Sequence, residues 1–127
     1  MERREFLKKR RLLQPILDST YDMKNNIGVM QGRLLPKYKN LYQAHPVNYW
    51  KEEFDIAKEI GLNCIEFILD FDSIKHNPLL REDGIFEINK VVNRTCVKVK
   101  TVCADYFIEA PLHSENIKTS EYSQKVF

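Results

Sequence analysis

The chain has 127 residues, of which 43% are hydrophobic and 30% charged, and its formal net charge is +2. These totals predict a single soluble globular domain, and so small a charge does not favour a nucleic-acid partner. No apolar run approaches the roughly 18 residues that would indicate a membrane span. The three cysteines are an odd number without paired Cys/His spacing, so we expect reduced, buried thiols in a cytoplasmic protein and no zinc site.

Residues 1–22 differ in composition from the rest of the chain, because basic residues crowd their first half. They are not a secretory signal, since no continuous apolar stretch follows the positive charges. One interpretation is a basic amphipathic helix that ends before Pro15 and binds an anionic surface. A solvated extension is the simpler interpretation and is favoured. We therefore expect a dispensable basic extension over residues 1–22 and a compact domain over residues 23–127.

An apolar run over residues 27–30 predicts the first strand, which ends at a polar, glycine-containing turn at residues 31–33. A loop over residues 32–47 follows. Loops of this length are uncommon inside compact domains and often serve as binding loops or lids.

The segment after this loop has the pattern of an amphipathic helix. Asn48 is a favourable N-cap, and Gly61 occupies the left-handed position that commonly follows a helix. Glu52 and Glu53 lie in the first turn, where the helix dipole favours negative charge. The apolar residues recur at helical spacing and are expected to face a sheet: Trp50, Phe54, Ala57 and Ile60.

Two further strand–helix units are predicted downstream. The run over residues 64–69 is almost continuously apolar, which is typical of a parallel strand buried on both faces. A loop over residues 70–83 leads to a helix over residues 84–94. A third strand is predicted over residues 99–104, and a third helix over residues 114–127.

The alternation of strands and helices predicts an α/β fold with right-handed crossovers and a parallel sheet. The apolar runs start 37 and 35 residues apart, which is the length of one βα unit. An eight-unit TIM barrel usually needs roughly 250 residues. We therefore expect residues 23–127 to form the first three βα units of a truncated (β/α)8 barrel.

Five short motifs occur in order and at fixed spacing: MQGRL at 30–34, HPV at 45–47, IEF at 65–67, NPLL at 77–80 and VCADYF at 102–107. Together they resemble the first three units of the sugar phosphate isomerase/epimerase family, which has the xylose-isomerase-like TIM barrel. The resemblance covers about residues 25–127. Cys96 stands where a glycine would more usually end a helix, a departure that concerns the turn and not the chemistry.

The resemblance implies a metal-assisted isomerisation or epimerisation of a ketose or ketose phosphate. In that family two carboxylates move a proton beside the carbonyl, and a divalent metal (Mn, Mg, Co or Zn) polarises the oxygens. The family's metal ligands come mostly from later strands, so no metal ligand and no complete catalytic set is assigned to this chain. The expected partner is a small sugar or sugar phosphate, and the 127 residues alone are expected to be inactive.

Five polar residues at strand ends are the candidate substrate-binding residues: Gln31, Arg33, Glu66, Asp70 and Asp105. Their positions follow from the rule that β/α arrays place their chemistry at the carboxyl ends of the strands. Glu66 interrupts an apolar strand, and a structural ion pair with Arg33 is an equally good interpretation. Arg33 suits a phosphate because of its planar guanidinium. Asp70 and Asp105 have turn-forming or capping roles as their alternative.

A second interpretation belongs to another class of protein. An open parallel sheet leaves strand edges unpaired, and such edges can pair with a partner or a second copy. The chain would then be a non-catalytic interaction or assembly module that self-associates through its sheet edges.

Overall fold

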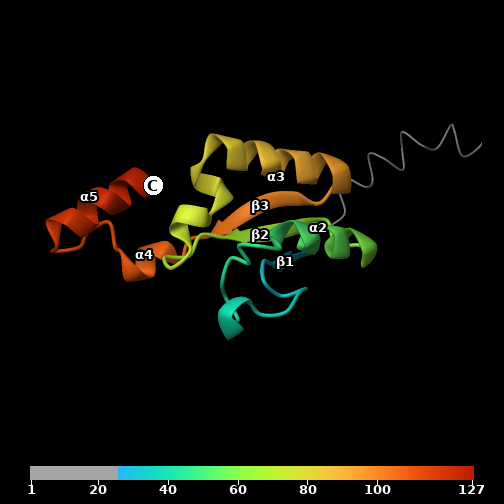
Figure 1. Cartoon of the computed structure of the whole chain (residues 1–127), viewed down its shortest axis with the longest axis horizontal. Helices are drawn as coiled ribbons and strands as arrows, with labels where there is room; N and C mark the ends of the chain where they lie inside the picture. Colours follow the sequence, from blue (N-terminus) through green and yellow to red (C-terminus); the bar gives the residue numbers. More distant parts are fainter. Residues whose placement is uncertain (1–25) are drawn as a thin grey trace, which may run out of the picture.

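The computed structural model describes residues 26–127, so the predicted basic extension over residues 1–22 lies outside the described residues. At its centre is a three-stranded sheet in the order β1-β2-β3 (Figure 1). Its strands are β1 (Gly28–Met30), β2 (Cys64–Ile68) and β3 (Lys98–Cys103). Both pairings are parallel, which confirms the prediction of a parallel α/β sheet.

Two helices cover one face of this sheet: α2 (Trp50–Glu59) and α3 (Glu82–Thr95), with α3 alongside β3 in Figure 1. Alternate residues of β2, Ile65 and Phe67, are fully buried against them. The core is completed by helix residues at helical spacing and by one residue just before β3: Trp50, Phe54, Ala57, Ile88 and Val91, and then Val97. The prediction for α2 was wrong at Ile60, which is 60% exposed because the helix ends one residue before it.

The helix ends differ in part from the sequence prediction. Helix α2 begins at Trp50 with Tyr49 as N-cap, so Asn48 is not the cap. Gly61 has a φ of 82° just beyond the helix, as predicted. Cys96 ends α3 with a φ of 63°, a left-handed conformation that glycine adopts more easily. Cys96 is also exposed, so the expectation of a buried thiol was wrong there, while Cys64 and Cys103 are half-buried.

The connections at the carboxyl ends of the strands contain more helix than predicted. Short 3-10 turns interrupt the loops at Tyr38–Asn40, Ile74–His76 and Pro78–Leu80. A short helix, α4 (Tyr106–Glu109), follows β3 where no helix was predicted, and α5 (Ile117–Val126) lies within the third predicted helix. Figure 1 shows α4 and α5 away from the sheet, beyond the carboxyl ends of the strands.

The second face of the sheet carries Met30, Glu66 and Thr101, which lie side by side on the three strands. Met30 and Glu66 are half-buried and Thr101 is exposed. Their neighbours along β2 face α2 and α3, so these residues point the opposite way. Among residues 26–127, no helix has the combination of length and apolar character needed to cross a membrane.

Candidate functional site

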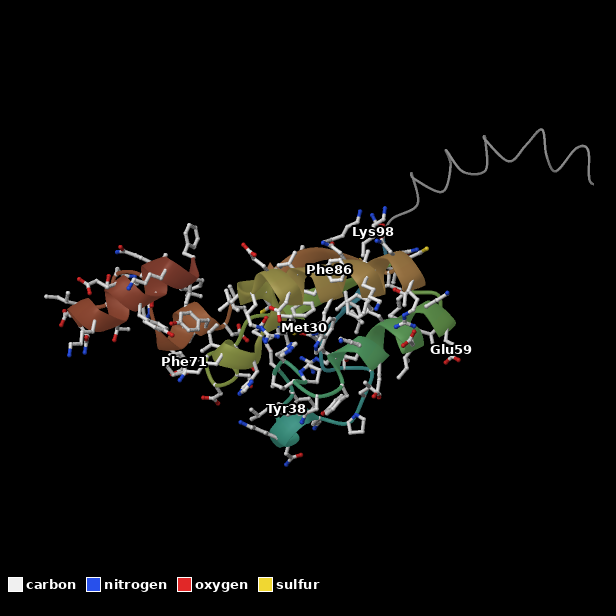
Figure 2. The ribbon with its side chains drawn as sticks, turned by 45° about the horizontal axis from the view of Figure 1, so that its top comes forward. Met30, Tyr38, Glu59, Phe71, Phe86 and Lys98 are labelled. Atoms are coloured by element: carbon white, nitrogen blue, oxygen red, sulfur yellow. The ribbon has the colours of Figure 1, made fainter. Side chains whose placement is uncertain are left out.

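A hollow of about 510 Å³ lies at the carboxyl ends of β2 and β3. Its polar lining comes from the loop before α2, from the segment after β2 and from the β3–α4 junction: Gln43, Asp70, Asp72, Asp105 and Glu109. In Figure 2, Phe71 of the same wall lies near α4, at the end of the molecule opposite Glu59 and Lys98. Parallel strands thus bring two of the predicted residues, Asp70 and Asp105, to one hollow.

Asp105 is held by two neighbours. The Gln43 side-chain amide donates a hydrogen bond of 2.7 Å to Asp105 Oδ2, and the Cys103 thiol lies 3.3 Å from Oδ1. Burial, followed by the hydrogen bond and the charge of Asp105, raises the pKa of Cys103. The thiol therefore stays protonated at neutral pH and acts as a weak donor, not as a nucleophile.

Asp70 is anchored to the long loop. Its Oδ2 accepts the backbone N–H of His45 at 3.0 Å, while Oδ1 is buried without a hydrogen-bond partner among residues 26–127. Burial raises the pKa of Asp70 because the charged form loses solvation that the backbone hydrogen bonds only partly replace. Asp70 thus joins the hollow to the loop that precedes α2.

Gln31 does not line this hollow. Its side chain is fully buried, and Oε1 accepts the backbone N–H of Ile68 at 3.1 Å. The same oxygen lies 3.0 Å from His45 Nδ1, so the imidazole must carry its proton on Nδ1 and donate it. Burial lowers the pKa of His45 to about 4. Gln31 and His45 are therefore a buried, uncharged pair that ties the loop to the strand ends.

Arg33 and Glu66 also lie outside the hollow. Arg33 is exposed, with its guanidinium carbon 5.7 Å from the centre of the Tyr42 ring. Glu66 sits in the middle of β2, paired in register with Met30 and Thr101. The ion pair considered between Arg33 and Glu66 is not among those formed within residues 26–127.

Sequence reasoning overlooked Glu53, whose carboxylate organises the loop after β1. It is 1% exposed and accepts the Gly32 N–H at 2.8 and 2.9 Å and the Leu34 N–H at 3.2 Å. Burial raises the pKa of Glu53, and the backbone hydrogen bonds oppose that rise. A signal existed, because Glu53 shares the helical face of Trp50 and Ala57 and so falls inside the apolar stripe.

Gln43 was also overlooked, and nothing in the sequence distinguishes it from other polar loop residues. Its role depends on a contact with Asp105, 62 positions away.

The residues of the hollow do not form a metal site by themselves. Within residues 26–127, no three His, Cys, Asp or Glu side chains are grouped so that they could hold a metal ion. The polar lining can instead bind hydroxyl groups, because carboxylate oxygens accept hydrogen bonds and the Gln43 amide both donates and accepts.

Comparison with known proteins gives little beyond this geometry. No family model matches the chain. A protein of Dictyostelium discoideum described as "ABC transporter A family member 1" is 42% identical over 53 residues. This stretch is 41% of the present chain and only 6% of that protein, so the chain is similar to a small part of it.

Proposed function

We propose that the chain supplies the first three βα units of a sugar phosphate isomerase/epimerase barrel and that the hollow at its strand ends binds a ketose or ketose phosphate. The observation that carries this proposal is the convergence of Gln43, Asp70 and Asp105 on one hollow from three separate segments. The parallel order β1-β2-β3 supports it, because consecutive units of a barrel are neighbours in the sheet.

The hollow suits a polyhydroxylated ligand because its acceptors are already oriented. Gln43 fixes Asp105, and the His45 backbone N–H fixes Asp70. Side chains held by such partners lose little conformational freedom when a ligand binds, which favours affinity. The volume of about 510 Å³ lies within the range of small-molecule sites.

In this proposal the described residues bind and orient the sugar and do not transfer its proton. The resemblance places the metal ligands mostly on later strands and assigns no complete catalytic set to this chain. A metal, when bound there, polarises the substrate oxygens. Asp70 and Asp105 hold hydroxyl groups on their side of the barrel mouth, and position the ligand for that chemistry.

The test is an NMR titration of the protein with D-fructose in the millimolar range. Amide signals of Gln43, Asp70 and Asp105 are expected to shift, and Asp105→Asn is expected to weaken binding about fivefold through loss of a charged acceptor. Glu59→Gln removes the same charge at the opposite end of the molecule and is the control (Figure 2). Shifts that are absent, or that Asp105→Asn leaves unchanged, would contradict the proposal.

The open sheet favours a second candidate, a non-catalytic assembly module. Within residues 26–127, β1 and β3 each pair on one side only, and Val102 of β3 is 46% exposed. Lys98 and Lys100 also lie on β3, and lysines on an edge strand oppose strand addition. Light scattering across a hundredfold concentration range tests this candidate. A dimer that Val102→Lys dissociates would support it, and a monomer throughout would exclude self-association through the sheet edges.

A further inference from the structure

A second hollow, of about 700 Å³, adjoins the first. Phe71, Asp72 and Glu109 line both hollows and form the wall between them. The second hollow lies between the segment after β2, α4 and α5. The two hollows therefore lie side by side beyond the carboxyl ends of β2 and β3.

The two hollows differ in the charge of their linings. The first contains three aspartates and Glu109 but no basic side chain. The second adds Lys75 and His76 from the 3-10 turn after β2 and Lys118 from the first turn of α5. All three basic side chains are exposed at the surface. The turn after β2 and the start of α5, more than 40 positions apart in the sequence, thus bring basic side chains to the second hollow, next to the acidic first hollow.

Aromatic rings also line the second hollow. Phe71 is 46% and Tyr122 is 54% exposed, and both line the second hollow beside the buried Tyr106. The Phe71 and Tyr106 ring centres are 5.5 Å apart, so Phe71 is packed on one side and open on the other. An open aromatic surface of this kind can contact the apolar C–H groups of a sugar.

We propose that the two hollows form one extended site for a phosphorylated ketose, with the hydroxylated chain in the first hollow and the phosphate at Lys75 and Lys118 in the second. This inference rests on the proposed function and names its substrate class. A phosphate monoester carries nearly two negative charges near neutral pH, so the carboxylates repel it and the lysines attract it. The arrangement of charge therefore fixes the orientation of the ligand.

This proposal assigns the phosphate to Lys75 and Lys118 and not to Arg33, the residue that the sequence analysis suggested for it. It lines neither hollow, and its guanidinium lies near the Tyr42 ring. The variant Arg33→Gln therefore tests the alternative that Arg33, and not Lys75 and Lys118, binds the phosphate.

The experiment compares the affinities of D-fructose, D-fructose 6-phosphate and inorganic phosphate, measured by NMR titration. The double variant Lys75→Gln/Lys118→Gln is expected to weaken fructose 6-phosphate binding at least about tenfold and to leave fructose binding unchanged. Lys125→Gln, in the last turn of α5 and outside the hollow, is the matched control. Unchanged amide spectra of the free variants establish that they are folded.

Each other outcome has a distinct meaning. If fructose binds in an Asp105-dependent manner but the lysine variant leaves fructose 6-phosphate affinity intact, the phosphate subsite is wrong and the proposed function stands. If Arg33→Gln produces the loss instead, the phosphate lies at Arg33. If inorganic phosphate binds as tightly as fructose 6-phosphate, the second hollow takes free anions and this inference fails. If neither sugar binds, both proposals fail.

Discussion

At the residue scale, buried polar side chains attach the loop before α2 to the strands. Gln31 and His45 are fully buried, and Glu53 is 1% exposed. Each hydrogen-bonds to a group distant in sequence, such as Glu53 to Gly32 or Gln31 to Ile68. Their hydrogen bonds offset the cost of burying polar atoms, and the loss of one partner leaves the other unsatisfied.

Glu53→Gln is expected to lower the free energy of unfolding by about 2 kcal/mol, because the negative charge and one of the two acceptor oxygens that face the Gly32 and Leu34 amides are lost. The side-chain NH₂ group of the glutamine would also face the Gly32 N–H, so that two hydrogen-bond donors would point at each other. Urea unfolding at pH 7 measures the change. Glu52→Gln alters the exposed neighbour on the same helical turn and should change stability by less than about 0.5 kcal/mol. Equal effects of the two substitutions would contradict the role of Glu53.

His45 is expected to make stability sensitive to acid. Its pKa falls from 6.5 to about 4 on folding. Between these two pH values the His45 side chain is therefore mostly protonated in the unfolded chain and mostly neutral in the folded chain. The stability that neutral His45 contributes is therefore lost as pH falls from 6.5 to about 4, by about 3 kcal/mol. His45→Asn removes the titrating group and keeps a donor toward Gln31.

The measurement is the change in unfolding free energy between pH 7 and pH 4.5 in the parent and in His45→Asn. Glu53 and Asp70, with raised pKa values, act in the opposite direction but are common to both proteins. The variant should lose less stability on acidification than the parent. His113→Asn, at an exposed position, is the control and should behave like the parent.

At the element scale, backbone geometry and close packing decide how α3 begins and ends. Cys96 holds the left-handed turn after α3 although it has a β-carbon. Near the start of the helix, Gly84 is buried against the Pro78–Leu80 turn, and a β-carbon on it would lie 2.3 Å from the Pro78 carbonyl oxygen. Position 96 thus has a conformation that favours glycine but holds a cysteine. Position 84 holds glycine because a β-carbon would not fit there.

Cys96→Gly is expected to raise the free energy of unfolding by about 0.5–1 kcal/mol, because glycine adopts positive φ without steric cost. Thermal unfolding under reducing conditions measures the effect. Cys96→Ala keeps the β-carbon and should leave stability nearly unchanged. A stabilisation by alanine equal to that by glycine would point to the thiol, not to the backbone.

Gly84→Ala is expected to destabilise the protein despite the gain in helix propensity of about 1 kcal/mol. The new β-carbon would meet backbone atoms of Pro78, which cannot move without displacing the turn. Asn89→Ala, on the exposed side of the same helix, should instead be neutral or slightly stabilising. A rise in thermal midpoint for Gly84→Ala would show that the turn adapts at little cost.

At the scale of the whole molecule, α2 and α3 cover one face of the sheet, and the other face carries Met30, Glu66 and Thr101, over which the described residues 26–127 place no helix. In a (β/α)8 barrel the helices lie outside and the second face of the sheet is the interior. The observed arrangement is compatible with a part of such a barrel, and the proposed sugar site lies where a barrel places its ligands.

The 127-residue protein is expected not to isomerise ketoses or ketose phosphates with added Mn²⁺, Mg²⁺ or Co²⁺. Such proton transfer needs two carboxylates and a metal held in fixed geometry, and within residues 26–127 no three His, Cys, Asp or Glu side chains are grouped so that they could hold a metal ion. Epimer formation is followed by chromatography, with an established sugar isomerase as positive control. Metal-dependent turnover that Glu66→Gln abolishes would show that the catalytic set is already present.

The sequence by itself determined the parallel sheet, its three strands and the helical face that covers it. These features follow from local periodicity, which can be recognised from residues close together in the sequence. It identifies the strands over residues 64–69 and 99–104 and the apolar stripe of Trp50, Phe54 and Ala57. The rule that parallel strands end on one side also placed Asp70 and Asp105 together.

Only the tertiary structure decided which polar residues are buried and which line a hollow. Gln31 and Asp105 both follow strands, yet Gln31 is fully buried and hydrogen-bonded to His45 and Ile68, while Asp105 lines the hollow. Gln43 and Lys118 gain their positions from contacts with segments far along the chain. Such contacts depend on how loops cross the strand ends, and residue spacing carries no information about that path.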